Sequence, residues 1–180
     1  LRSSPGKITT INFDGTRSEY NEKLDMKLRL CVSGKLRNSP ELMLFNKYRI
    51  RTERIGKSIN VPSIIVSEYE GVKWTEFLKN VFSTQSFSAK SHKVLLDERG
   101  KNLSSISLSE SLRSHRDSGT QEFIFFIGGA EGVPEKIWDN FDEIFSFGKM
   151  VWPHFLARVM LMEQLYRAST ILAGLPYHKN

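Results

Sequence analysis

The amino-acid sequence predicts an α/β protein with a mainly parallel β-sheet and flanking helices. From residue 26 onward, apolar segments of strand length alternate with segments whose apolar residues recur at helical spacing. One segment, residues 123–127 (FIFFI), is apolar throughout, which is typical of a strand buried on both faces of a parallel sheet. A chain of 180 residues, 39% of them hydrophobic, can form one domain with a substantial core.

The predicted elements follow one another in a regular order. Strands are expected at residues 28–32, 63–69, 93–97, 123–127 and 144–147. Helices are expected from Pro40, over 74–81, over 107–114 after a serine-rich cap, from Pro134 to residue 141, and from Pro153 to residue 172. Residues 98–101 (ERGK) predict a turn after the third strand.

The last helix is apolar over more of its surface than one sheet can cover. Its apolar positions include Leu156, Val159, Met160, Met162, Leu165 and Leu172. Such a helix usually packs on its own sheet and on a second surface, often another subunit. Gly174 and Pro176 end this helix.

The first 25 residues differ from the rest of the chain. They are polar, weakly patterned, and carry equal numbers of basic and acidic residues. The first clear strand pattern begins directly after Met26. We therefore expect residues 1–25 to be an extension outside the core and residues 26–180 to form a single domain; an ordinary N-terminal arm is the alternative.

Composition narrows the possible partners and compartments. The net charge of +6 is compatible with a polyanionic partner, although many basic proteins bind none. The single cysteine, Cys31, allows no internal disulfide, favours a reducing compartment, and is expected to be a buried core thiol. There is no apolar run long enough for a bilayer and no signal-peptide pattern, so we expect a cytoplasmic protein.

Two loops near the C-terminus predict a ligand pocket. Residues 128–132 (GGAEG) follow the fourth strand, and residues 148–154 (GKMVWPH) precede the last helix. The first loop has the spacing of neither a dinucleotide fingerprint nor a P-loop, which disfavours nicotinamide and ATP enzymes. The loops fit the walls of a nucleotide-type pocket; a tight turn without ligand, with Met150 and Trp152 in the core and Lys149 solvated, is the alternative.

Other side chains could support chemistry near these loops. His154 begins the last helix, where the helix dipole lowers a histidine pKa, so a neutral imidazole could accept a proton; a structural histidine is the alternative. Arg158 and Arg167 are nine residues apart and fall on opposite helix faces, and Glu163 can pair with Arg167. The tail residues Tyr177, His178 and Lys179 suit contact with RNA, or they fray.

Several reaction classes are disfavoured. The sequence shows no serine–histidine–acid or cysteine–histidine arrangement, and its four histidines have no metal-ligand spacing, so no metal site is expected. Transfer of a group already activated on a cofactor remains, because it depends on positioning more than on a nucleophilic side chain.

The motifs in the last third of the chain resemble those of the ribosomal RNA large subunit methyltransferase H family, which are SPOUT-class pseudouridine N3-methyltransferases. The similarity extends from Met26 to Asn180 and is carried by residues 128–132 (GGAEG), Lys149-Met150, Pro153-His154, residues 163–168 (EQLYRA) and residues 176–179 (PYHK). This sequence departs from the family pattern at two positions. Family members often have serine where Gly148 stands and phenylalanine where Trp152 stands.

The resemblance implies a fold, a cofactor and an assembly. The C-terminus would be tucked through a loop as a trefoil knot, a rare topology, and two copies would form a homodimer. S-adenosylmethionine would lie in the knot, held largely by backbone groups. The residues implied to bind it are Leu96, Gly129, Phe147, Gly148, Lys149, Met150, Val151, Trp152 and Pro153.

The resemblance also implies a substrate, a pseudouridine in large-subunit ribosomal RNA, within the assembled ribosome. N3 of this base would attack the sulfonium methyl after losing a proton, and nearby cations would stabilise the anion. The implied catalytic residues are His154, Arg158, Tyr177 and His178, and the implied RNA-binding residues are Arg167 and Lys179. No general base is assigned. The alternatives are a non-catalytic RNA- or ribosome-binding module of the same fold, and an unrelated α/β enzyme acting on a phosphorylated small molecule.

Overall fold

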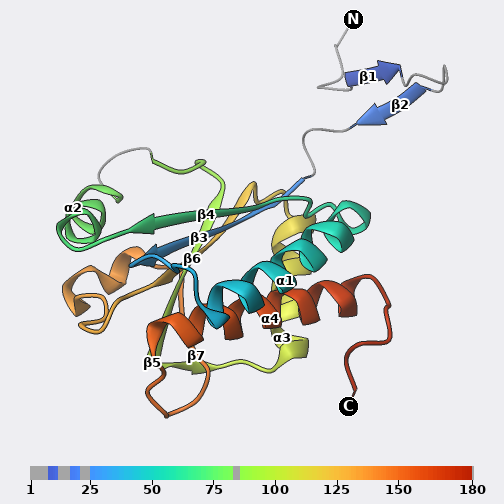
Figure 1. Cartoon of the computed structure of the whole chain (residues 1–180). Helices are drawn as coiled ribbons and strands as arrows, with labels where there is room; N and C mark the ends of the chain where they lie inside the picture. The colour runs from blue at the N-terminus through green and yellow to red at the C-terminus, as the bar shows by residue number, and fades with distance from the viewer. Residues whose placement is uncertain (1–7, 12–16, 21–24, 83–85, 180) are drawn as a thin grey trace, which may run out of the picture.

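The computed structural model contains a five-stranded, fully parallel sheet with helices on both faces (Figure 1). It describes residues 8–11, 17–20, 25–82 and 86–179. The strand order is β4-β3-β6-β5-β7. The bounds of these strands are Lys27–Ser33 (β3), Ile64–Tyr69 (β4), Ser91–Asn102 (β5), Glu122–Ile127 (β6) and Glu143–Ser146 (β7). The predicted fold class, a mainly parallel sheet flanked by helices, is confirmed.

Helices cover the two faces of the sheet unequally. One face carries α1 (Pro40–Gly56), α3 (Ser105–Asp117) and α4 (His154–Leu172), and the other carries α2 (Val72–Asn80) and the 3-10 helix η2 (Glu135–Asn140) (Figure 1). A further 3-10 turn, η1 (Lys57–Ile59), follows α1. None of the described helices has the length and apolar character needed to cross a membrane.

Side chains that alternate between the two faces of the sheet along each strand form two separate hydrophobic cores. In β3, Leu28 and Leu30 face the α4 side, whereas Cys31 faces the α2 side. Every residue of β6 is buried, as its continuous apolar pattern predicts for a central parallel strand. Cys31 is fully buried, and burial raises the pKa of its thiol to about 12, so the prediction of an inert core thiol is confirmed.

Serine caps begin two of the helices where the sequence predicts them. The Ser39 hydroxyl accepts a hydrogen bond from the Leu42 amide at 3.3 Å, and Pro40 occupies the first turn of α1. The Ser104 hydroxyl accepts one from the Ser107 amide at 3.0 Å at the start of α3. These caps satisfy amides that the first helical turn leaves free.

The turn predicted at residues 98–101 is wrong. Strand β5 continues to Asn102 and pairs with β7 again after a shift in register between Leu96 and Lys101. A Cβ on Gly100 would lie 2.7 Å from the Phe145 backbone, so this glycine permits close approach of two strands rather than a turn.

Three further details differ from the sequence-based prediction. The helix expected from Pro134 to residue 141 is the shorter 3-10 helix η2, and Phe141 follows it in extended conformation. The fifth strand lies one residue earlier than expected. Strands β1 (Ile8–Ile11) and β2 (Arg17–Tyr20) form an antiparallel pair in a segment for which no strand was predicted. Strand order and pairing do not test the trefoil knot, which stays a prediction.

Candidate functional site

A cavity lies where β6 and β7 end, beside the point at which the first ladder of β5 is interrupted. It encloses about 530 Å³ of empty space, part of it open to solvent. Its walls come from Leu96 at the end of the first β5 ladder, Ile127 at the end of β6, Ser146 at the end of β7, and the start of α4. Parallel sheets bind ligands at the carboxyl ends of their strands, and this cavity occupies that position.

The glycine-rich loop after β6 forms one wall by folding back on itself. The Gly132 amide donates to the Gly129 carbonyl at 2.9 Å. A Cβ on Gly128 would lie 2.7 Å from the carbonyl carbon of Gly132, so a side chain there would separate the two arms of the turn. Because the loop has so little side-chain bulk, its backbone forms the surface that a ligand would meet.

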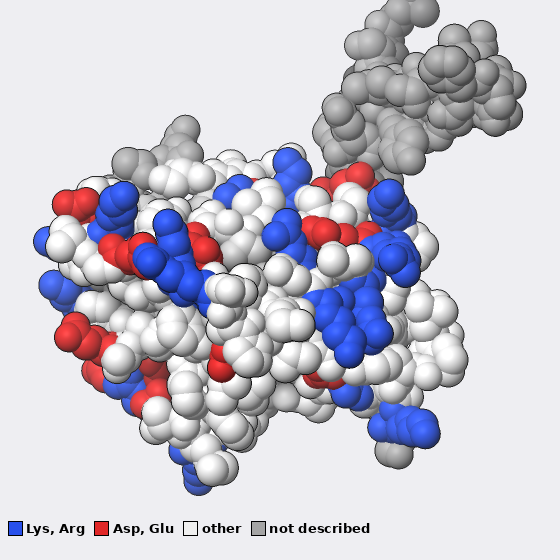
Figure 2. Space-filling view, viewed as in Figure 1, with Lys and Arg blue, Asp and Glu red and all other residues white. Residues whose placement is uncertain are grey.

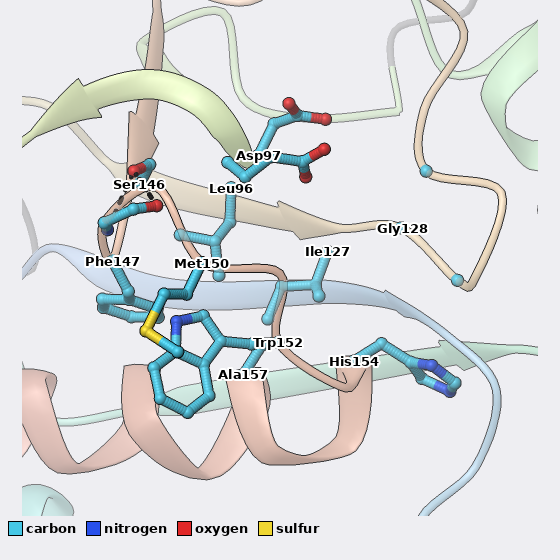
Figure 3. A pocket seen from close by; sticks show the side chains of 14 residues that line it. Leu96, Asp97, Ile127, Gly128, Ser146, Phe147, Met150, Trp152, His154 and Ala157 are labelled. Atoms are coloured by element: carbon cyan, nitrogen blue, oxygen red, sulfur yellow. Dashed lines mark hydrogen bonds between the residues drawn. The ribbon is translucent and has the colours of Figure 1, made fainter.

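The loop between β7 and α4 forms the opposite wall. The buried Ser146 hydroxyl fixes its start, because it accepts a hydrogen bond from the Gly148 amide at 3.0 Å. Met150 and Trp152 follow, and Figure 3 shows their side chains lying alongside each other at the cavity. They keep 69% and 39% of their surface exposed, which is unusual for large apolar side chains with no further partner.

Two carboxylates also line the cavity. Asp97, labelled in Figure 3, and Glu98 come from the irregular part of β5. Arg99 Nε donates to Asp97 Oδ1 at 2.8 Å. Burial disfavours the ionised form of Asp97, but hydrogen bonds from the side chain and backbone of Arg99 outweigh that effect and lower its pKa. Asp97 is therefore a fixed carboxylate at the cavity wall.

His154 lies at the start of α4, and Figure 3 shows its ring pointing away from Met150 and Trp152. Its ring packs against Phe155 at a centroid distance of 4.0 Å. Burial, and next the charge of Arg158, lower the pKa of its imidazole below the ordinary value of 6.5. The neutral form predicted from the helix dipole is thus favoured by two further causes, and His154 can accept a hydrogen bond at neutral pH.

Arg158 is buried one turn further along α4, with a side chain that is 1% exposed. It donates to Glu68 Oε1 at 3.2 Å, to the Gly34 carbonyl at 2.9 Å, and to the Ser33 carbonyl. Burial lowers the pKa of its guanidinium to about 10, so it stays charged at neutral pH. These contacts tie the ends of β3 and β4 to α4, and within one protomer Arg158 does not face solvent or RNA.

The tail packs on the second half of α4. The Tyr177 hydroxyl donates to Glu163 Oε1 at 3.1 Å, and its ring meets Tyr166 edge-on at 4.6 Å between centroids. Arg167 pairs with the same Glu163 oxygen at 2.6 Å, which confirms the predicted ion pair, and its guanidinium lies 4.9 Å from the Tyr177 ring centroid. Burial, together with hydrogen bonds to Tyr48 and Glu163, raises the pKa of Tyr177 to about 12. The phenol is therefore a hydrogen-bond donor at neutral pH.

The structure brings together some of the predicted site residues and separates others. Those that line the cavity are Leu96, Gly129, Phe147, Gly148, Met150, Trp152 and His154. Lys149, Val151 and Pro153 belong to the same loop, but their exposed side chains are not part of the lining. Tyr177, His178, Lys179 and Arg167 lie elsewhere, because the tail follows the far end of α4.

Several lining residues were missed from the sequence. They are Asp97, Glu98, Ile127, Ser146 and Ala157, whereas Gly128 and Gly132 belong to the loop that the sequence already placed at the pocket. Ile127 and Ser146 end β6 and β7, Asp97 and Glu98 follow the first ladder of β5, and only the order of those strands in the sheet makes them neighbours. These residues could have been predicted only if the adjacency of β5, β6 and β7 had been known.

Comparison with known proteins agrees with this geometry. A sequence model of the family described as "Predicted SPOUT methyltransferase" matches residues 26–178. A Cereibacter sphaeroides protein named ribosomal RNA large subunit methyltransferase H is 44% identical over 155 residues, covering 86% of this chain and 99% of the relative. Proteins of the same name from Dinoroseobacter shibae and Paracoccus denitrificans are 43% and 37% identical, with the same coverage of both chains.

Two solved structures show distant similarity. A probable methylase family protein from Haemophilus influenzae aligns with 87% of this chain and 72% of its own, with a TM-score of 0.44 and 10% identity. The SpoU methyltransferase AviRb from Streptomyces viridochromogenes, crystallised in complex with AdoMet, has a TM-score of 0.39 and 12% identity; the match covers 81% of this chain and 58% of AviRb. We base no argument on these similarities.

The match to the family and the identity to its named members cover the whole five-stranded sheet and the cavity. They confirm the resemblance seen in the sequence motifs. The chain belongs to the ribosomal RNA large subunit methyltransferase H family of SPOUT methyltransferases.

Proposed function

We propose that this protein binds S-adenosylmethionine in the cavity and methylates N3 of a pseudouridine in large-subunit ribosomal RNA, within the assembled ribosome. The observation that carries the proposal is the cavity beside β5 at the ends of β6 and β7, which lies in the region shared with relatives named for this RNA. A ribosomal substrate would place the enzyme in the cytoplasm.

The residues present fit this cofactor. Leu96, Ile127 and Trp152 offer apolar surface for an adenine ring, and the loop at Gly128 and Gly129 offers backbone groups without bulk. Asp97 and Glu98 supply negative charge, which complements a sulfonium and an ammonium group. The bound cofactor supplies a methyl group that is already activated, so the cavity needs no nucleophilic side chain of its own.

The protein's own residues would perform the other steps of methyl transfer. They must hold the base against the cavity and stabilise the charge that develops as N3 loses its proton. Neutral His154 at the cavity wall can accept a hydrogen bond there. We propose that Arg158 acts as a positioning residue, since it fixes the end of β3 beside Gly129 and His154 and contributes its charge from within the protein.

Calorimetric titration tests the cofactor assignment. We expect saturable binding of S-adenosylmethionine and none of ATP or NAD. Transfer of a labelled methyl group to large-subunit RNA should follow on ribosomes lacking the modification, and not on protein-free RNA. Cofactor binding without transfer to any RNA would favour the non-catalytic ribosome-binding module, and binding of ATP alone would overturn the methyltransferase proposal.

The proposed catalytic residues do not meet within one chain. His154 lies at the cavity, whereas Tyr177 contacts Glu163, which is nine residues or about 13 Å further along α4. His178 Nδ1 is buried and has no hydrogen-bond partner among residues 25–82 and 86–179. We propose that a homodimer brings the tail of one subunit to the cavity of the other.

Exposed apolar side chains support this homodimer. Met150 and Val151 in the cavity loop, and Leu156 in the first turn of α4, keep 69%, 79% and 40% of their surface exposed. Clustered apolar residues of this size mark an interaction surface rather than ordinary solvent-facing positions. Because they border the cavity, a second copy seated on them would bring its own residues close to the bound cofactor.

Deleting residues 177–180 is expected to leave cofactor affinity unchanged and to lower methyl transfer by roughly 100-fold. The reason is that the tail contributes Tyr177, His178 and Lys179 to RNA but forms no part of the cavity wall. Calorimetry and ribosome methylation measure the two effects separately. Full activity of the truncated protein would show that the tail has no role in transfer.

A mixing experiment distinguishes a tail that acts across the dimer from one that acts within its own chain. Subunits carrying Gly129→Arg lack a usable cavity, and subunits lacking residues 177–180 lack the tail. If the tail crosses over, co-refolding the two inactive forms in equal amounts should restore roughly a quarter of wild-type activity, since half of the dimers would have one complete site. No restoration would show that each tail serves its own chain.

Basic side chains on one face supply a surface for RNA. Figure 2 shows Lys and Arg gathered over the face formed by α1 and α4. Helix α1 contributes Lys47, Arg49, Arg51 and Arg54. Together with Arg167 and Lys179 these cations can contact phosphates, in keeping with the net charge of +6.

The affinity for S-adenosylmethionine should depend on pH through His154. Its lowered pKa keeps the imidazole neutral above 6.5, so affinity should be constant there; protonation at lower pH would add a second positive charge beside Arg158 and repel the sulfonium. We expect binding to weaken progressively as the pH falls below 6.5. In His154→Asn this dependence should disappear. An equal decrease in the variant would assign the effect to other groups.

A further inference from the structure

A second cluster of polar side chains lies at the amino end of the sheet, opposite the end that carries the cavity. His92 is the second residue of β5, Glu143 is the first residue of β7, and His115 lies near the end of α3. One ligand atom from each of these three residues lies within 4.8 Å of the others. His92 precedes Leu96 by four residues along β5, so the cluster is roughly 13 Å from the cavity.

The histidines are held with one ring nitrogen turned to a partner. His115 Nδ1 lies 3.3 Å from the Thr120 hydroxyl, and His92 Nδ1 lies 3.8 Å from Asp142 Oδ2. The two imidazoles stack with their centroids 3.8 Å apart. In metal sites, a ligating histidine generally directs its other ring nitrogen to a carboxylate or another acceptor, which fixes the ring and its tautomer.

The remaining nitrogen of His92 faces Glu143 in poor hydrogen-bond geometry. His92 Nε2 is buried and makes no hydrogen bond of good geometry to any residue that the structure describes, although Glu143 Oε1 lies 3.4 Å away. A buried polar atom without a partner is costly and calls for an explanation. Two imidazoles and a carboxylate converging on such an atom form a donor set that zinc prefers.

We propose that His92, His115 and Glu143 bind one Zn²⁺ ion through His92 Nε2, a nitrogen of His115 and a carboxylate oxygen of Glu143. The ion would join β5, α3 and β7 at the amino end of the sheet and would serve the stability of the fold rather than methyl transfer. Asp142 would act as the outer partner of His92; its Oδ2 already accepts from the Lys93 amide at 2.7 Å and lies 3.6 Å from Lys93 Nζ.

The electrostatics of the cluster agree with this proposal. Burial, and next the proximity of His115, lower the pKa of His92, whereas Glu143 and Asp142 act in the opposite direction. A divalent ion would neutralise the partly exposed carboxylate of Glu143.

Zinc titration of the full-length protein, first freed of metal with a chelator, tests the proposal. We expect one Zn²⁺ per chain by calorimetry. At a zinc concentration about 100 times the dissociation constant, the midpoint of thermal unfolding should rise by roughly 5–10 °C and return to its original value with excess chelator. Co²⁺ should produce the visible absorption of a nitrogen- and oxygen-ligated site.

Variants distinguish this site from adventitious zinc. His92→Gln should abolish binding and Glu143→Gln should weaken it at least about tenfold; Glu143→Gln changes a partly exposed side chain and should fold normally by circular dichroism. Glu76→Gln on α2 and His154→Gln at the cavity should bind zinc like the wild type. Absence of binding, or equal binding by Glu143→Gln and the wild type, would overturn the proposal.

Discussion

Replacing Gly129 with arginine is expected to weaken S-adenosylmethionine binding by at least about 100-fold while leaving the protein folded. Gly129 lies on the cavity wall, and a Cβ there would point at the Ser33 hydroxyl, 2.9 Å away. A serine side chain can rotate to admit one methyl group, but an arginine must extend into the space that the cofactor needs. Calorimetry gives the affinity, and a thermal unfolding curve gives the stability.

The matched controls use the same loop. Gly129→Ala should bind the cofactor within a few-fold of the wild type, since only Ser33 has to move. Gly128→Ala should instead lower stability, because its Cβ would meet the backbone of Gly132 at 2.7 Å and the turn cannot close. Unchanged affinity in Gly129→Arg would place the cofactor outside this cavity and refute the site assignment.

Replacing Arg158 with methionine is expected to lower the free energy of unfolding by about 3–5 kcal/mol. The change leaves Glu68 without its ionic partner and the carbonyls of Ser33 and Gly34 without their donor, in a region where Arg158 itself is fully buried. Breaking such a pair costs more than its net contribution, because the two carbonyls lose their donor and Glu68, with 29% of its side chain exposed, stays partly desolvated. Chemical denaturation measures the difference.

Arg167→Met is the matched control for Arg158. Arg167 makes one ion pair, with Glu163 four residues earlier, and keeps 26% of its side chain exposed, so its loss should cost only about 0.5 kcal/mol. The double replacement Arg158→Met with Glu68→Leu should regain part of the stability, since no unpaired charge remains. Equal losses for Arg158→Met and Arg167→Met would show that the buried contacts are not those that stabilise the ends of β3 and β4.

Weak binding of cofactor to Arg158→Met would have a structural cause as well as an electrostatic one. Arg158 holds the end of β3, and Ser33 at that end contacts the Gly129 position of the cavity wall. A loss of affinity that persists when the protein is stabilised by lower temperature would support the proposed positioning role. Normal affinity at low temperature would restrict Arg158 to stability alone.

Local patterns in the chain were enough to predict the α/β class, most strands and helices, the serine cap of α3 and the two cavity loops. These features could be predicted because buried residues recur at every second position in a strand and at every third or fourth position in a helix. The spacing of apolar residues therefore identifies both the type of element and its buried face. The prediction of a turn at residues 98–101 was wrong because Gly100 lies against the backbone of Phe145. Phe145 belongs to another strand, and no local pattern in the sequence reveals this contact.

Contacts between distant segments decided the rest. Asp97, Gly128 and Ser146 became neighbours only when β5, β6 and β7 were ordered in one sheet. The same sheet drew Arg158 into the interior beside Glu68, and it brought His92 and His115, which have no metal-ligand spacing in the chain, to a common point with Glu143. Strand order and helix docking depend on how entire faces of the sheet and the helices pack together. The partners of a charged side chain are therefore determined by the fold and not by its neighbours in the sequence.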